Sequence, residues 1–112
     1  LFRLGWGAPK GDFSSVLARS FAWVAAFAPG DRLVGFINVA WDGGLHFFVL
    51  DTTVHPDWRH RGVGTELVTR AVEACRGHGE WVHVDCEAGL AQLYRGAGFR
   101  EAGWAGLVRL AP

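Results

Sequence analysis

Hydrophobic positions repeat along this chain with two periods, which predict strands in some segments and a helix in another. Apolar residues alternate or run together in four segments, as in partly or fully buried β-strands: 21–27, 33–41, 45–54 and 81–86. Between the last two of these segments, apolar residues recur with the period of an α-helix. They form one apolar face of Val63, Leu67, Val68, Ala71, Val72 and Cys75. The opposite face carries Glu66, Arg70, Glu73 and Arg76. We therefore predict an amphipathic helix that ends at Gly77 and Gly79.

Turn and capping residues complete the set of predicted elements. They indicate a helix over Phe13–Arg19 capped by Asp12, turns at Ala28–Asp31 and Asp42–Gly44, a helix over Leu90–Ala97 closed at Gly98, and two strand pieces between Phe99 and Leu110 around Gly103. Antiparallel strands followed by a strand–helix–strand crossover predict an α/β fold with a mixed, mostly antiparallel central sheet and flanking helices.

The crossover places Val54 and Trp81 on parallel neighbouring strands of this sheet. In open sheets, ligands bind where neighbouring strand ends diverge. The helix that begins at Val63 aims its N-terminus at that opening, so fold pattern and ligand chemistry predict the same location.

The loop before this helix carries the most informative stretch of the chain, Val54-His55-Pro56-Asp57-Trp58-Arg59-His60-Arg61-Gly62-Val63-Gly64-Thr65. Backbone N–H groups at a helix start, with no Cβ in the way, form a site for a phosphate or pyrophosphate. Two neighbouring arginines, Arg59 and Arg61, supply cationic charge for the same anion. The loop therefore predicts a nucleotide-like or coenzyme ligand. An ordinary tight turn with solvated arginines is the structural alternative.

Two familiar glycine motifs do not fit this loop. The dinucleotide-binding fingerprint needs a third glycine where this chain has Leu67, and the phosphate loop of nucleotide triphosphatases needs a lysine that Gly64-Thr65 lacks. What remains is Arg-x-x-Gly-x-Gly from Arg59 to Gly64, with Val54-x-Pro56 upstream.

That pattern resembles the coenzyme A motif of the GNAT superfamily of N-acetyltransferases, written Gln/Arg-x-x-Gly-x-Gly/Ala. A second segment, Leu93-Tyr94-Arg95-Gly96-Ala97-Gly98-Phe99, looks like the superfamily's late Leu-Tyr-x-x-x-Gly-Phe segment. The resemblance covers roughly Phe21 to the C-terminus. It implies the acyl-CoA N-acyltransferase fold, with acetyl-CoA as co-substrate and an amine as acceptor.

The resemblance also implies roles for individual residues. The backbone from Arg61 to Thr65 would bind the coenzyme's pyrophosphate, and the strand edge from Thr52 to Val54 would bind its pantetheine amides. Tyr94 stands at the superfamily's usual position for protonating the leaving thiolate, although a core aromatic with a local hydrogen bond is the alternative. The coenzyme-binding set is Thr52, Thr53, Val54, Arg59, His60, Arg61, Gly62, Val63, Gly64, Thr65 and Tyr94.

The general base is not determined by the sequence. Some superfamily members carry Glu or His where this chain has Phe48 and Leu50, and both are apolar here. Alternation or a bulge decides which way the nearest carboxylate, Asp51, points. The candidates are Asp51, His46, His55, His83, Asp85 and a water molecule.

Composition narrows the class of protein further. The 112 residues predict one domain, 1–112, and a formal net charge of zero gives no field that would recruit nucleic acid. No apolar run approaches the roughly 20 residues that cross a bilayer, and no signal segment opens the chain. The two cysteines fit reduced thiols, and no ligand spacing predicts a metal. We expect a cytoplasmic protein without a metal or a membrane contact.

The start of the sequence is unusual for the superfamily that it resembles. It begins at Leu1, contains no methionine, and has only about twenty residues before the first predicted strand. We expect that the first strand or helix is truncated or lost.

The sequence predicts an N-acetyltransferase that moves an acetyl group from acetyl-CoA to a primary amine by direct attack. Two alternatives remain open: an acyltransferase with a longer acyl donor, and a coenzyme-A-binding regulatory module with little turnover. The space near Phe47, Val49 and Tyr94 would distinguish acyl lengths. Superfamily members are often dimers, so a homodimer is one expected assembly.

Overall fold

A single mixed sheet of seven strands organises the chain in the computed structural model, which describes residues 3–5, 14–86, 90–102 and 105–110. The elements are β1 (Arg3–Gly5), α1 (Ser14–Arg19), β2 (Ala22–Ala28), β3 (Arg32–Trp41), β4 (His46–Val54), the 3₁₀ turn η1 (Pro56–Trp58), α2 (Val63–Cys75), β5 (Trp81–Val84), α3 (Ala91–Gly96), β6 (Arg100–Ala102) and β7 (Ala105–Arg109). The spatial order of the strands is β1-β2-β3-β4-β5-β7-β6. Of these neighbours, β4 and β5 pair in parallel and the others pair antiparallel, which confirms the mixed α/β fold.

Several element boundaries differ from the sequence prediction. The fourth predicted strand, 81–86, ends as β5 at Val84, where its pairing with β7 also ends. The pattern does not predict β1, because three residues are too few to establish a period. The third helix begins at Ala91 rather than Leu90. The predicted cap Asp12, the helix start Phe13 and the break at Gly103 lie outside the described residues.

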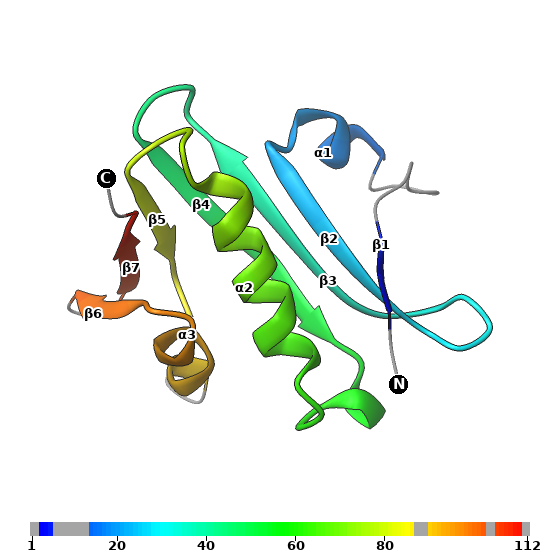
Figure 1. Ribbon diagram of the computed structural model, residues 1–112. Coiled ribbons are helices and arrows are strands. Elements are labelled where there is room, and N and C mark those ends of the chain that lie inside the picture. Colours follow the sequence, from blue (N-terminus) through cyan, green and yellow to red (C-terminus); the bar gives the residue numbers. More distant parts are fainter. Residues whose placement is uncertain (1–2, 6–13, 87–89, 103–104, 111–112) are drawn as a thin grey trace.

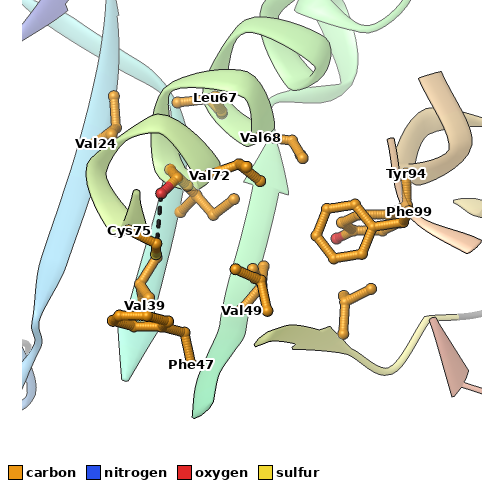
Figure 2. Packing of buried hydrophobic residues seen from close by; sticks show 14 of the residues in the cluster. Val24, Val39, Phe47, Val49, Leu67, Val68, Val72, Cys75, Tyr94 and Phe99 are labelled. Carbon is orange, nitrogen blue, oxygen red and sulfur yellow. Dashed lines mark hydrogen bonds between the residues drawn. The ribbon is translucent and has the colours of Figure 1, made fainter. Parts of the chain in front are cut away.

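Helix α2 supplies the core against β2, β3 and β4, whose faces it crosses (Figure 1). Its buried residues are the six that the helical period predicts: Val63, Leu67, Val68, Ala71, Val72 and Cys75. Figure 2 shows four of these side chains, Leu67, Val68, Val72 and Cys75, on the side of the helix that faces Val39, Phe47 and Val49 of the sheet. Burying a Val, Leu or Phe side chain contributes about 1.5–3 kcal/mol, so this interface stabilises the domain substantially.

The strands β4 and β5 separate soon after they pair. Their parallel register runs from His46–Trp81 to Phe48–His83, whereas β4 stays paired with β3 as far as Val54. Figure 1 shows β4 and β5 moving apart toward the N-terminal end of α2. Within the part of the chain that the structure describes, β4 beyond Phe48 has no strand partner on its β5 side, so its backbone edge is open there.

A β-bulge interrupts β4 inside this open stretch. Phe36 of β3 pairs with Thr53 and Asn38 pairs with Leu50, so Asp51 and Thr52 together stand opposite one β3 residue. Asp51 adopts a left-handed backbone with φ 61°. The bulge leaves Asp51 exposed and Thr52 partly buried, and this settles the direction that the sequence left undecided.

Candidate functional site

The first turn of α2 presents free backbone donors, because its N-cap supplies no side chain. Gly62 is the N-cap, with φ 86° and no side-chain hydrogen bond. A Cβ built on Gly62 would meet nothing within 4 Å, so the space outside the helix start is open. The helical ladder begins with Glu66 N–H donating to the Gly62 carbonyl at 3.0 Å. The N–H groups of Val63, Gly64 and Thr65 therefore have no partner within the helix, as an anion site requires.

Gly64 lies where the first turn of α2 meets two other elements. A Cβ at this position would stand 3.4 Å from Leu93 of α3 and 3.6 Å from Val54 at the end of β4. These are ordinary van der Waals distances, so an alanine would fit. The helix start, α3 and the open end of β4 thus converge on one place.

The two arginines of the loop are exposed and are held by weak local contacts. The Nε–H of Arg59 donates to the Val54 carbonyl at 3.4 Å, and the guanidinium of Arg61 lies 4.8 Å from the Trp58 ring centroid. A guanidinium has five N–H donors, so these contacts leave donors for an anion. His60 is exposed too and has a left-handed φ of 62°.

The Tyr94 side chain reaches the same region from α3. It is only 4% exposed, and its ring meets Phe99 edge-on at 5.5 Å (Figure 2). Burial raises the pKa of the Tyr94 phenol, and the nearby Thr52 side chain works in the opposite direction, while the Cys86 thiol adds to the rise. Tyr94 is therefore protonated at neutral pH, the state that a proton donor needs.

Thr52 contributes a polar atom that the sequence did not single out. Its Oγ1 is buried and, among the described residues, makes no hydrogen bond of good geometry, although the side chain is close enough to affect the Tyr94 pKa. Its neighbour Thr53 donates to the Asp51 carbonyl at 3.0 Å across the bulge. The bulge thus directs the Thr52 hydroxyl toward Tyr94, whereas the Thr53 hydroxyl stabilises the backbone of the bulge itself.

The structure brings together two of the five candidate base side chains. His46 Nδ1 and His83 Nε2 lie 2.7 Å apart in a hydrogen bond between β4 and β5. His55 instead accepts from the Asp57 N–H at 3.1 Å and caps η1. Asp51 is exposed at the bulge, and Asp85 is exposed just beyond β5.

Sequence reasoning missed three features of this region: the Thr52 hydroxyl, the joining of His46 with His83, and the Cys86 thiol beside Tyr94. The first two depend on strand register, which pairs residues far apart in the sequence, whereas Cys86 follows β5 and lies near Tyr94 of α3 without strand pairing. The sequence did place His46 and His83 between apolar residues in two strands predicted to be neighbours. The offset between those strands was unknown, so the contact between the two rings could not be predicted.

The described residues contain no group of three or more His, Cys, Asp or Glu side chains placed to hold a metal ion. None of their helices has the length and apolar character required to cross a membrane.

The chain is similar to known acetyltransferases in sequence and in fold. The family model of the GNAT acetyltransferase domain matches residues 18–101. A Deinococcus radiodurans protein assigned as an acetyltransferase has 26% identity and a TM-score of 0.72, over 81% of this chain and 63% of its own. The chain thus spans less than two thirds of that relative.

Two further structures share the fold at lower identity. A Staphylococcus aureus protein assigned as an acetyltransferase is 16% identical with a TM-score of 0.78, over 91% of this chain and 92% of its own. Glucosamine-6-phosphate N-acetyltransferase from Arabidopsis thaliana is 15% identical with a TM-score of 0.72, over 81% of this chain and 69% of its own. The family model covers most of the chain and includes the glycine loop, β4 and Tyr94, so the protein belongs to the GNAT acetyltransferase family.

Proposed function

We propose that this protein is an N-acetyltransferase that moves the acetyl group of acetyl-CoA to a primary amine by direct attack. One observation carries the proposal: the unpartnered N–H groups at the start of α2 lie beside the open edge of β4, where Tyr94 also reaches. An anion site, an extended backbone edge and a proton donor in one place match the three parts of an acyl-coenzyme A: pyrophosphate, pantetheine and thioester.

The coenzyme's phosphates would bind at the start of α2. The backbone from Arg61 to Thr65 provides the N–H donors, and the first turn of the helix favours negative charge. Arg59 and Arg61 add charge from the exposed side of the loop, at the cost of weak contacts to Val54 and Trp58.

The pantetheine arm would lie along β4 between Thr52 and Val54. The amides of an extended arm can pair with an open strand edge as another strand would. At the inner end of that edge, the bulge brings the thioester close to Tyr94 and to the buried Thr52 hydroxyl.

The chemistry requires a proton for the leaving thiolate. Tyr94 is its donor in this proposal, since burial keeps the phenol protonated. The same burial raises the phenol pKa and so opposes donation to a thiolate, whose conjugate thiol has a pKa of about 8.5 in simple thiols. The Thr52 hydroxyl acts against this penalty because it lowers the pKa of Tyr94.

The packing near the reaction centre favours a short acyl group. Phe47 is fully buried beside Gly79 at the other end of α2, whereas Val49 and Tyr94, 5% and 4% exposed, belong to the hydrophobic core nearer the open edge of β4. A longer acyl chain would have to displace these core side chains, whereas a two-carbon acetyl group would not.

The test is release of coenzyme A thiol from acetyl-CoA in the presence of an amine panel: tryptamine, spermidine, glucosamine 6-phosphate, free amino acids and a peptide with a free amino terminus. We expect amine-dependent thiol release with at least one of them, and an acetylated product that is heavier by one acetyl group. Saturable acetyl-CoA binding without transfer to any amine would instead identify a coenzyme-binding module. Absence of both would contradict the proposal.

A cytoplasmic location and a homodimer stay predictions. Fractionation of cells that make the protein and sedimentation of the purified chain would test them.

A further inference from the structure

The hydrogen-bonded histidines His46 and His83 form a proton-accepting pair that the coenzyme site does not use. Their ring nitrogens are 2.7 Å apart, the rings lie 4.9 Å between centroids, and both residues are partly buried. Phe48 stacks on His83 at 5.1 Å and restricts its ring. Among the described residues, the second ring nitrogen of each histidine makes no hydrogen bond, so one nitrogen per ring is free to exchange a proton.

The pair lies where β4 and β5 begin to separate. His83 is opposite Phe48, the last residue of β4 that pairs with β5. Leu50, the last residue before the bulge, is two positions further on. At about 3.3 Å per residue in a parallel strand, His83 is roughly 7 Å from that point along β4, a distance that a short chain of water molecules can bridge.

The pair also faces the side from which an acceptor must arrive. Phe47 and Val49 point into the core under α2, so the alternate positions His46 and Phe48 face the other side of the sheet. Helix α2 and the coenzyme loop occupy the first side. An amine that reaches the thioester between the diverging strands therefore approaches from the side of the histidines.

A buried polar atom lies on β3 beside the bulge. Asn38 is opposite Leu50 and shares its face of the sheet. It is 2% exposed, and its Oδ1 has no hydrogen-bond partner among the described residues. Such a group costs free energy unless a donor meets it, and a buried water molecule is a donor of suitable size.

We propose that His83, with His46 as its proton relay, is the general base that deprotonates the acceptor amine. This inference rests on the proposed acetyl transfer. The ammonium form of the acceptor gives one proton to His83, directly or through intervening water molecules. His83 passes a proton across the hydrogen bond to His46, which releases one to solvent. No base on β4 at Phe48 or Leu50 is then needed.

The remaining bonds balance without any other reactant. The neutral nitrogen forms the C–N bond to the acetyl carbonyl, and the C–S bond breaks as the tetrahedral adduct collapses. The thiolate takes the Tyr94 proton, and the second proton of the nitrogen returns through solvent to the Tyr94 oxygen. The net products are an N-acetyl amide, coenzyme A thiol and one proton.

The charged groups around the pair allow His83 to act as a base. Burial lowers the pKa of His83 and the neighbouring His46 lowers it further, whereas Asp85 and Asp42 oppose both effects. Asp42 stands in the turn before β4 and accepts the His46 backbone N–H at 3.3 Å, and Asp85 follows β5. His83 is accordingly neutral at physiological pH, ready to accept a proton.

The test compares kcat/KM against pH for the wild type and His83→Gln, with the amine from the panel that the wild type acetylates fastest. Glutamine can still hydrogen-bond to His46 but cannot take a proton. General-base catalysis typically contributes 10²–10⁴-fold, so we expect a loss of about 10²-fold or more at neutral pH and disappearance of the acidic limb of the profile. Acetyl-CoA affinity should not change. Imidazole added to His83→Ala should restore part of the rate.

Two further variants keep the result interpretable. His46→Gln should lower the rate less and still show an acidic limb, because His83 remains. His78→Gln, an exposed histidine outside the pair, should behave as the wild type. Wild-type kinetics in a folded His83→Gln would overturn the inference while leaving acetyl transfer intact. Failure of the wild type to acetylate any amine would overturn both.

Discussion

The two ends of α2 share a backbone conformation but differ in their surroundings. Gly62 before the helix has φ 86° and Gly77 after it has φ 84°, and a Cβ at either would meet nothing within 4 Å. At the Gly77 end, the His78 N–H bonds the Cys75 carbonyl, and the N–H groups of Glu80 and Trp81 bond the Leu45 carbonyl. At the Gly62 end, the N–H groups of the first turn have no partner within the helix.

The difference follows from the strands beneath the helix. At the Gly77 end β4 and β5 pair, and Gly79 packs so closely that a Cβ would come within 2.5 Å of Phe47. At the Gly62 end the strands diverge and a bulge turns Thr52 inward. A left-handed glycine therefore does not identify a site by itself, because the separation of the neighbouring strands determines whether its exposed N–H groups can meet a ligand.

The largest expected effect is on turnover at the Gly62 end. Tyr94→Phe keeps the edge-on packing with Phe99 but removes the proposed proton donor. We expect kcat to fall by about 10²-fold, with little change in acetyl-CoA affinity or melting temperature. Thiol-release kinetics measure kcat, and calorimetry measures the acetyl-CoA affinity and the melting temperature. An unchanged kcat would assign thiolate protonation to water.

A stability change is expected at the other end. Gly79→Ala forces a Cβ against Phe47 and the Leu45 carbonyl, and overpacking of this kind costs about 1–3 kcal/mol. Urea unfolding should report that loss in the free energy of unfolding. Acetyl-CoA binding by the folded variant should match the wild type, and weakened binding would show that the two ends are not independent.

A substitution in the first turn should separate stability from binding. Gly64→Ala meets only ordinary contacts with Leu93 and Val54, and alanine favours a helix by up to about 1 kcal/mol over glycine. The added methyl group narrows the approach of the pyrophosphate. We expect unchanged or higher stability together with roughly tenfold weaker acetyl-CoA binding, equivalent to about 1.4 kcal/mol. Binding equal to the wild type would place the phosphates elsewhere.

The smallest expected effect concerns pH and stability. The pKa of His83 is lowered from its ordinary value of 6.5 in the folded protein, mainly by burial. The unfolded chain therefore binds the His83 proton more tightly than the folded protein does. The stabilisation that comes from keeping His83 neutral is complete above pH 6.5 and is lost as the pH falls below that value. Urea unfolding at pH 7.5 and 5.5 should show a smaller loss on acidification in His83→Gln than in the wild type. Equal losses would contradict the lowered pKa.

Much of the fold follows from local pattern. The buried face of α2 was predicted residue by residue, since a helix that packs on a sheet must repeat its apolar positions every 3.6 residues. The parallel pairing of β4 with β5 was predicted from the crossover. The glycine loop and Tyr94 were found through motifs, and their assignment to one coenzyme site stays a prediction.

What could not be predicted depends on register between distant strands. The bulge that exposes Asp51 and buries the Thr52 hydroxyl arises from an offset between β3 and β4. The His46–His83 contact joins residues 37 positions apart, and a shift of one residue in either strand would move one histidine to the other face. From the sequence, His46 and His83 were separate candidates for the general base, because periodicity describes the faces of one element and not the pairing between two elements.

The central claim is that the Gly62 end of α2 binds acetyl-CoA. Calorimetric titration of acetyl-CoA into the wild type, Gly62→Glu and Gly77→Glu tests it most directly, because both variants add the same charge at left-handed glycines in open space. We expect saturable binding by the wild type and Gly77→Glu, and its near abolition in Gly62→Glu. Equal binding by the two variants, or no binding by the folded wild type, would contradict it.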